Sequence, residues 1–468
     1  MKRWFAGMTA LVAAAGVACL LLGGWLMKDR DEQPVEVTLL AGELSDFSPI
    51  LVEMILTDSA NGRHWWEQSL AFQENSFQLN SRMVSSTGVV DDVLPDAPPE
   101  SRMELDYEKF DEAMPFRTFP SGTYRVKDYL DQYDYTLSLF AQDKTVWTSF
   151  PWFTVVPTEG DVVEVESYQN GSSTSSSFSG YSFETSLSVL SLSDGLYFTL
   201  PTVSFVGQRD WLPEGGQGDL ISYEGYSGIF YVDPAHLDAE TGEAVVEPLL
   251  MLPIGDNLTR QVFELLWVEE LGQLALLAGE NNELVVYLYD PATRTETARL
   301  SLGHCQRRNI ELDEKSAISV MWPPVAAVQD NKLIILQHDI YQEDGNFWLA
   351  QVWELTENGA SSLIEAGVVL DQYAEVAPEH IRLVGDRLYL LAIAGWQMQK
   401  FDLCCLEDSG LTAMARFSSA GGQEDQDSRM LWNYQVPEEL TRRLKLYDHE
   451  TTGDYRVWRQ LELKVTAP

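Results

Sequence analysis

The chain has 468 residues, enough for one large domain or for two or three ordinary ones, and 45% of the residues are apolar, so a substantial core can be buried. It carries 31 basic and 72 acidic residues, which give a net charge of −41. This charge repels nucleic acid and anionic lipid headgroups and argues against both as the main partner.

The N-terminal stretch Trp4–Met27 contains no charged residue and has the length of a membrane-spanning helix, which needs about 20 apolar residues. Lys2 and Arg3 precede it, so the positive-inside rule favours a cytoplasmic N-terminus and an extracytoplasmic remainder. Two alternatives stay open: a cleaved signal peptide, whose apolar region is usually shorter, and a lipoprotein signal that uses Cys19. We expect residues 1–30 to form a cytoplasmic stub and a single-pass anchor in the cell membrane.

Cysteine usage limits the covalent and metal chemistry of the extracytoplasmic part. This part contains Cys305, Cys404 and Cys405, an odd number that permits at most one internal disulfide. Cys404 and Cys405 are adjacent and would point to opposite faces of a strand. No CxxC pair is present, so the spacing predicts no metal site.

Residues 31–165 contain strand-like runs such as VEVTLL, ILVEMILTD and YTLSLFAQDKTVW. We expect an N-terminal β-rich domain here; the alternative is that these strands supply additional blades to the repeats that follow. The flexible stretch NGSSTSSSFSG, Asn170–Gly180, is either an interdomain linker or a long hairpin loop.

Four segments share a hairpin pattern of strand, tight polar turn and more apolar strand. They are Val189–Leu200, Leu265–Ala278, Ala326–Gln337 and Ile381–Ala392. Their turns carry Gly, Asn or Asp, which tolerate the positive φ that short hairpin turns require. A parallel α/β sheet would need amphipathic helices between its strands. The one helical candidate, Asn257–Leu271, fits a strand entering a turn equally well.

A second pattern places an acidic residue at the end of a strand that contains an aromatic residue. It occurs at Asp233, Asp290, Glu354, Asp402 and Asp448, at intervals of 57, 64, 48 and 46 residues. Proline follows the first two acids and cannot continue a central strand. We interpret the acid as structural, because it can accept hydrogen bonds from the backbone of the following turn. Units of about four strands at this period are typical of propeller blades.

These repeats resemble WD40-like and quinoprotein-like β-propellers over roughly residues 185–468. The resemblance is generic, since neither a GH…WD pair nor a quinoprotein tryptophan-docking motif is present, and no ligand carries over. The runs FPSGTYRVKDYLDQYDY and PWFTVVP are similar to N-terminal regions of uncharacterised membrane-anchored proteins of the bacterial envelope, which implies a location. We therefore expect an all-β protein whose β-propeller, with blades of about four antiparallel strands, covers residues 166–468.

The sequence lacks P-loop, HExxH, GxSxG, dinucleotide-binding and EF-hand motifs. The best binding candidates are Arg209, Asp210 and Trp211, because they lie in a long Gly- and Pro-containing insertion after the first hairpin. His338 and Asp339 follow the strand LIIL and are candidates for a propeller mouth. No cofactor is expected, and loose calcium coordination by acidic turn tips is the weaker alternative.

The absence of a catalytic motif favours a ligand- or protein-binding scaffold over an enzyme. The sequence predicts a membrane-anchored extracytoplasmic β-propeller with an unknown protein or glycan partner and no nucleic-acid partner. A propeller-based hydrolase or lyase with paired carboxylates, and calcium as a metal, is the alternative. A third hypothesis is an envelope subunit whose anchor packs against another helix through its small residues.

Overall fold

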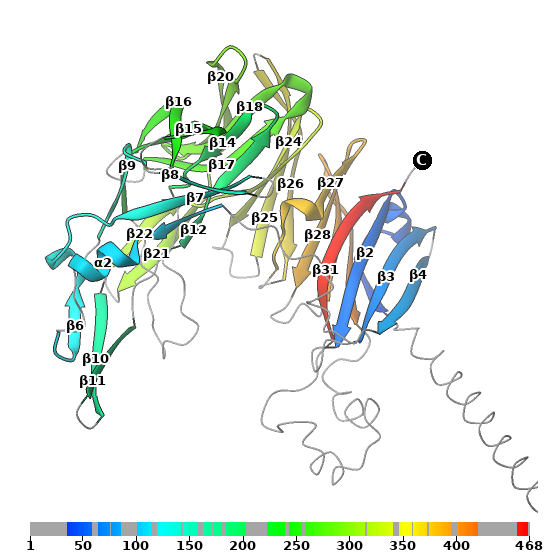
Figure 1. Ribbon diagram of the computed structural model, residues 1–468. Helices are drawn as coiled ribbons and strands as arrows, with labels where there is room; N and C mark the ends of the chain where they lie inside the picture. Colours follow the sequence, from blue (N-terminus) through cyan, green and yellow to red (C-terminus); the bar gives the residue numbers. More distant parts are fainter. Residues whose placement is uncertain are drawn as a thin grey trace, which may run out of the picture. The chain divides into compact units, whose positions relative to one another are not determined.

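The computed structural model of the protein describes residues 35–58, 64–74, 76–85, 101–113, 119–141, 144–148, 150–157, 162–170, 173–179, 184–202, 222–238, 243–254, 259–313, 316–339, 346–357, 359–371, 374–394, 400–419 and 456–466. These residues form several antiparallel β-sheets, with one short α-helix among them, α2 (Tyr107–Ala113) (Figure 1). The prediction of an all-β protein is confirmed at this level.

No helix in the described ranges is long and apolar enough to cross a membrane. The predicted anchor in residues 1–30 lies outside those ranges.

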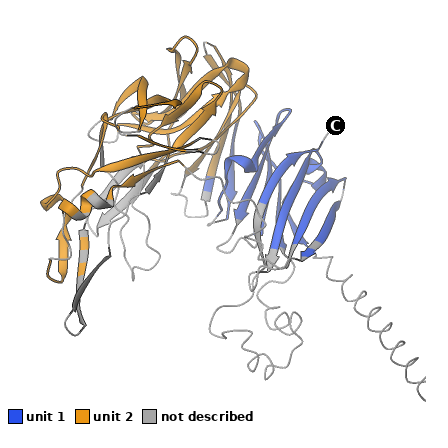
Figure 2. Ribbon diagram, viewed as in Figure 1, with its two compact units in different colours: residues 1–97, 343–347, 365–468 blue, residues 98–342, 348–364 orange. Residues whose placement is uncertain are grey.

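The chain divides into two compact units, shown in different colours in Figure 2. Unit 1 comprises residues 1–97, 343–347 and 365–468, and unit 2 comprises residues 98–342 and 348–364. The two units are defined by spatial compactness, so they do not test the domain boundaries predicted at residues 30 and 165. These boundaries stay a prediction.

Unit 1 contains two sheets. The first has the order β1-β30-β29-β28-β27 and the second β31-β2-β3-β4. The strands are β1 (Val35–Ala41), β2 (Ile50–Asp58), β3 (His64–Gln73), β4 (Ser76–Ser85), β27 (Ile381–Val384), β28 (Arg387–Ala394), β29 (Lys400–Glu407), β30 (Gly410–Ser419) and β31 (Arg456–Val465). Both sheets combine strands from near the two ends of the chain, since β1 pairs with β30 and β2 pairs with β31.

Strand alternation determines which side chains of β31 enter the core. Leu461 and Leu463 are buried in a cluster with residues of β2 and β29, whereas Glu462 and Lys464 point to the opposite face. Aromatic rings fill the centre of this cluster, where Phe401 stacks on Phe417 at 4.9 Å between ring centroids. The last strand of the chain therefore contributes directly to the core of unit 1.

Unit 2 contains the sheets β12-β5-β7-β8, β13-β14-β15-β16 with β9 added to β15, and β17-β18-β19-β20. It also holds most of β23-β24-β25-β26, and two smaller sheets, β11-β10-β6 and β21-β22. The strands are β5 (Arg102–Leu105), β6 (Gly122–Arg125), β7 (Tyr135–Ala141), β8 (Lys144–Thr148), β9 (Phe153–Val156), β10 (Val162–Asn170), β11 (Ser173–Ser179), β12 (Glu184–Ser186), β13 (Ser188–Leu192), β14 (Gly195–Thr199), β15 (Ser222–Leu237), β16 (Ala244–Ile254), β17 (Arg260–Val268), β18 (Gln273–Glu280), β19 (Glu283–Asp290), β20 (Thr295–His304), β21 (Arg307–Asp313), β22 (Ser316–Met321), β23 (Val325–Gln329), β24 (Lys332–Asp339), β25 (Asn346–Thr356) and β26 (Gly359–Leu370).

The sheet β17-β18-β19-β20 is covered on both faces. Every residue of β18 is buried. Leu274, Leu276 and Ala278 belong to one apolar cluster, and Ala275 and Leu277 to the cluster on the other face. A strand between two apolar layers needs apolar residues at every position, which explains the continuous run QLALLA.

All four predicted hairpins are confirmed, as β13-β14, β17-β18, β23-β24 and β27-β28. Three of the turns use positive φ, at Gly272 (62°), Asp330 (57°) and Gly385 (63°). The ambiguous stretch Asn257–Leu271 contains the strand β17 and no α-helix in its described part. Local turn chemistry was therefore sufficient to locate these strands.

The acid-at-strand-end interpretation is confirmed at Asp290, the last residue of β19. Its Oδ1 accepts a hydrogen bond from the backbone N–H of Ala292 at 2.8 Å, and its Oδ2 accepts one from the Thr293 hydroxyl at 2.8 Å. The Thr293 hydroxyl and these backbone donors hold the pKa of Asp290 below its usual value. Asp233 likewise accepts the N–H of Ala235 at 2.8 Å.

Two other members of the pattern, Glu354 and Asp402, require correction, and so does the strand end predicted at Asp233. The strand β15 continues past Asp233 to Leu237, with its pairing interrupted after Val232 where the proline removes a donor. Glu354 lies inside β25, and Asp402 is the third residue of β29 rather than its end. Asp448 lies outside the described residues.

Candidate functional site

Two groups of residues were predicted as binding candidates. Arg209, Asp210 and Trp211 lie outside the described residues and stay a prediction. His338 is half-buried near the end of β24, and its imidazole stacks on the indole of Trp348 with 4.5 Å between ring centroids and 12° between planes. Asp339 is the last residue of β24. The described contact of His338 is therefore an aromatic stack between neighbouring strands.

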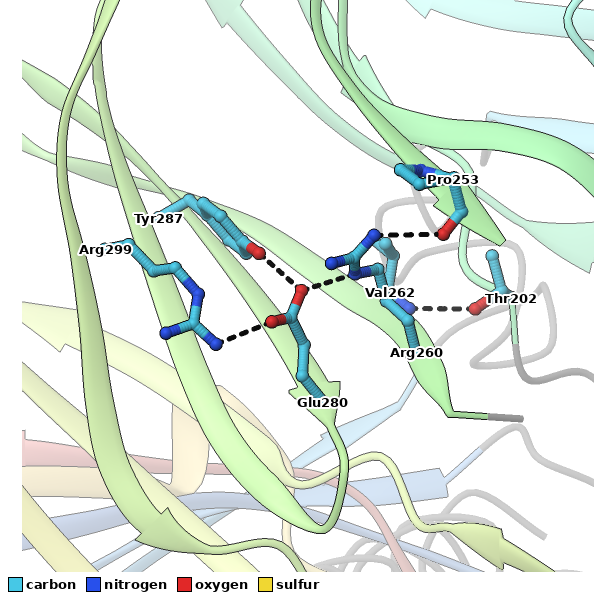
Figure 3. A network of polar contacts seen from close by, with 7 residues as sticks. All are labelled: Thr202, Pro253, Arg260, Val262, Glu280, Tyr287 and Arg299. Carbon is cyan, nitrogen blue, oxygen red and sulfur yellow. Dashed lines mark hydrogen bonds and ion pairs between the residues drawn. The ribbon is translucent and has the colours of Figure 1, made fainter. Parts of the chain in front are cut away.

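The two ends of the predicted insertion, Thr202–Gly228, are held by buried hydrogen bonds, and its last residues, from Ser222, belong to the strand β15. The backbone N–H of Thr202 donates to the carbonyl of Val262 at 3.0 Å, and the N–H of Val262 donates to the Thr202 hydroxyl at 2.8 Å (Figure 3). Near the other end of the insertion, the Ser227 hydroxyl donates to the carbonyl of Leu200 at 2.6 Å. Thr202 and Ser227 are both buried, so these bonds fix the backbone at each end.

A network of four polar side chains lies beside this base, one from each strand of the β17–β20 sheet. We call Arg260, Glu280, Tyr287 and Arg299 the Glu280 network. In Figure 3, Arg260 and Arg299 approach the carboxylate of Glu280 from opposite sides. The register explains the grouping, because Arg260 pairs with Glu280 across β17-β18 and Tyr287 pairs with Arg299 across β19-β20.

The carboxylate of Glu280, only 5% exposed, accepts hydrogen bonds from three side chains. Its Oε1 accepts from the Tyr287 hydroxyl and from Nε of Arg260, and its Oε2 accepts from Arg299 at 2.6 Å. Arg260 also donates to the carbonyl of Pro253 in β16, at 3.2 Å. A buried carboxylate with three donors is fully satisfied, so the network is a fixed arrangement rather than a loose surface ion pair.

The protonation states follow from this environment. Burial raises the pKa of Glu280, but the hydrogen bonds from Tyr287, Arg299 and Arg260 outweigh burial and leave this pKa below its usual value. Burial and the bond to Glu280 raise the pKa of the Tyr287 phenol. The pKa of Arg299 is also raised, by Glu280 first. At neutral pH the network therefore holds one carboxylate, two guanidinium groups and a neutral phenol.

This set of charges suits binding better than acid–base catalysis. A general acid or base works best with a pKa near the operating pH, and the pKa values of Glu280, Tyr287 and Arg299 are shifted away from neutrality. Two guanidinium groups facing one carboxylate leave one positive charge in excess. This positive excess within the network is opposite in sign to the net charge of the chain, which is −41.

No sequence motif marks the Glu280 network, because its members are spread over forty residues. One local signal was present, the pair Asn281-Asn282, whose φ values of 50° and 70° form the turn between β18 and β19. Asn-containing two-residue turns fix hairpin register. That register places Glu280 on the same face as Tyr287, but it says nothing about Arg260.

A second polar surface lies in unit 1, on the sheet β31-β2-β3-β4. It is a depression of about 360 Å³ lined by Glu53, Met54, Ile55, Glu67, Gln68, Ser69, Asn80 and Glu462. Its acids have cationic neighbours: Lys464 Nζ lies 2.6 Å from Glu53 and 3.2 Å from Glu462, and Arg82 pairs with Glu67. These pairs reduce its negative charge, and it is a weaker candidate than the Glu280 network.

Metal and thiol chemistry receive no support from the described ranges. Within them, no group of three or more His, Cys, Asp and Glu side chains is placed to hold a metal ion. Cys305, Cys404 and Cys405 are buried thiols, and burial raises the pKa of Cys305 to about 12. A thiol with so high a pKa is a poor nucleophile at neutral pH.

No protein-family model matches the chain, and no curated protein matches it significantly.

Proposed function

We propose that the protein is a membrane-anchored, extracytoplasmic β-propeller that binds a protein or glycan partner through the insertion after its first hairpin. It acts as a binding scaffold, with Arg209, Asp210 and Trp211 as the contact residues. The hydrolase or lyase alternative stays a prediction from the sequence.

The observation that carries this proposal is the fixed base of the insertion. Thr202 and Val262 exchange two hydrogen bonds, and Ser227 is tied to Leu200, so both ends of the insertion leave a packed sheet at defined points. Binding loops on a rigid scaffold lose less conformational freedom when a partner docks. The Glu280 network stiffens the neighbouring strand ends.

Two features support the propeller part of the proposal. Three sheets, β13-β14-β15-β16, β17-β18-β19-β20 and β23-β24-β25-β26, each have a path of four strands that are consecutive in the chain, as in propeller blades. The strand β31 from the end of the chain pairs with β2 from near its start. A ring of blades can be closed by a blade that combines strands from both ends of the chain, and this pairing fits such a closure.

Site-specific photocrosslinking in intact cells tests the binding function. A photoreactive residue replaces Trp211 in the full chain, and a control carries it at Val245, an exposed position of β16 in the same unit. We expect a discrete crosslinked species from position 211 that excess purified protein competes away. Adducts of equal yield and pattern from both positions, or none from position 211, would contradict the proposal.

A further inference from the structure

We propose that the Glu280 network is a carboxylate-binding site, in which Arg299 receives an acidic group of the partner. This inference rests on the proposed binding function and names the chemistry of its ligand. It follows from three properties of the network: its charge, the donors that Arg299 has left, and the rigidity of its guanidinium.

Among the described residues, three cations, Arg260, Arg299 and Arg307, lie around two acids, Glu280 and Glu283. Glu280 is the acid that both Arg260 and Arg299 contact. The next acid on this face, Glu283, accepts a hydrogen bond from Ser301 at 3.2 Å. At the same turn a third cation, Arg307, donates to the side chain of Asn282. The cations here attract an anionic ligand, whereas the acidic surface elsewhere on the chain repels one.

Arg299 is the cation best placed to receive that ligand. It projects from β20, the outermost strand of its sheet, and its side chain is 43% exposed, against 28% for Arg260. A guanidinium has five N–H donors, and the described partners of Arg299 are Glu280 and Tyr287. The remaining donors have no partner among the described residues.

The guanidinium is also held in one orientation. Glu280 fixes one of its nitrogens at 2.6 Å, and the group lies over the Tyr287 ring, 5.9 Å from the ring centroid. A preorganised guanidinium loses little freedom when it binds a second anion. Its planar pair of N–H groups matches the two oxygens of a carboxylate, which makes an acidic side chain or chain terminus the fitting ligand class.

Arginine-selective labelling of the intact full-length protein in detergent tests this site without the partner. Phenylglyoxal modification of Arg299 is followed by mass spectrometry in sodium acetate, in acetamide as the neutral analogue, in inorganic phosphate, and in sodium chloride of equal ionic strength. Arg82, an exposed arginine paired with Glu67 in unit 1, is the internal control. We expect acetate to slow modification of Arg299 severalfold and to leave Arg82 unchanged. The variant Tyr287→Phe, which loses the hydroxyl bond to Glu280, should show weaker protection.

Equal labelling rates of Arg299 in acetate and chloride would overturn the inference, and so would equal protection by phosphate or equal protection of Arg82. Because labelling needs no partner, these results do not depend on the crosslinking at position 211. A failed crosslink with intact acetate protection would reject the proposed function alone, and the reverse pattern would reject the carboxylate site alone.

Discussion

Arg416 and Asp402 face each other on the neighbouring strands β30 and β29, and the guanidinium donates two hydrogen bonds to the carboxylate, at 2.7 and 2.8 Å. Asp402 is completely buried, whereas the side chain of Arg416 is 30% exposed and also lies 3.5 Å from Asp371. The two partners therefore depend on the pair to different degrees. Removing the arginine leaves a buried charge, and removing the aspartate leaves an arginine with a second acid nearby.

We expect Arg416→Ala to destabilise unit 1 by about 3–5 kcal/mol, the usual cost of a buried charge without its partner. Asp402→Ala should cost clearly less, because Arg416 keeps Asp371 and solvent. Urea denaturation followed by tryptophan fluorescence measures both values. An equal loss in the two variants would show that the pair stabilises the sheet through packing rather than through charge.

The second prediction concerns Glu264 in β17, whose pKa is raised by burial to about 7. The folded state prefers the protonated form, so this residue lowers stability as the pH rises from the carboxyl's ordinary pKa to about 7. We expect Glu264→Gln to match the wild type at pH 4 and to be more stable at pH 8, on the order of 2 kcal/mol. Urea unfolding at both pH values decides this, and equal differences at the two pH values would refute it.

Some features of the fold were predictable from the sequence, and the physical reason is locality. The turn between β27 and β28 needs a positive φ, and the two turn residues, Gly385 and Asp386, predict this from their residue types alone. Asp290 is similar, since its hydrogen-bond partners, Ala292 and Thr293, lie within the next three residues. Strands with turns of this kind can be located without knowledge of the rest of the chain.

Other features depend on pairings that no local pattern specifies. Asp402 shows the same aromatic-acid pattern as Asp290, yet its partner is Arg416 on the next strand, so the pattern alone gave the wrong interpretation. The pairing of β2 with β31 joins segments about four hundred residues apart, and Glu280 takes its partners from three other strands. Tertiary register creates these contacts, and composition or spacing does not encode it.

The third prediction uses two adjacent residues of β31. Leu463 is completely buried, and Lys464 is a half-exposed residue that pairs with Glu53 and Glu462. We expect Leu463→Ala to cost about 2–5 kcal/mol, because it opens a cavity in the core. Lys464→Ala should cost less than about 1 kcal/mol, because exposed ion pairs contribute little.

Hydrogen exchange of the backbone amides in β2 measures the loss of stability in Leu463→Ala and in Lys464→Ala. The amides of β18 in unit 2 serve as a reference. Faster exchange in β2 for Leu463→Ala alone is the expected result. Unchanged exchange in that variant would mean that the C-terminal strand does not stabilise unit 1.

The last prediction separates the insertion from its base. We expect replacement of residues 207–218 by a short Gly-Ser link to change the melting temperature by only a few degrees, because changes in the length of surface loops cost little. The variant Thr202→Ala should cost more, about 1–3 kcal/mol, since it removes the acceptor of the buried Val262 N–H.

Both variants keep the Glu280 network, so acetate protection of Arg299 should survive in the replacement variant. Partner crosslinking, monitored from a photoreactive residue at position 206 in both backgrounds, should be lost in the loop replacement and only weakened in Thr202→Ala, which keeps the bond between Ser227 and Leu200. A loop replacement that unfolds the protein would place Trp211 in the core and would exclude it as a contact residue.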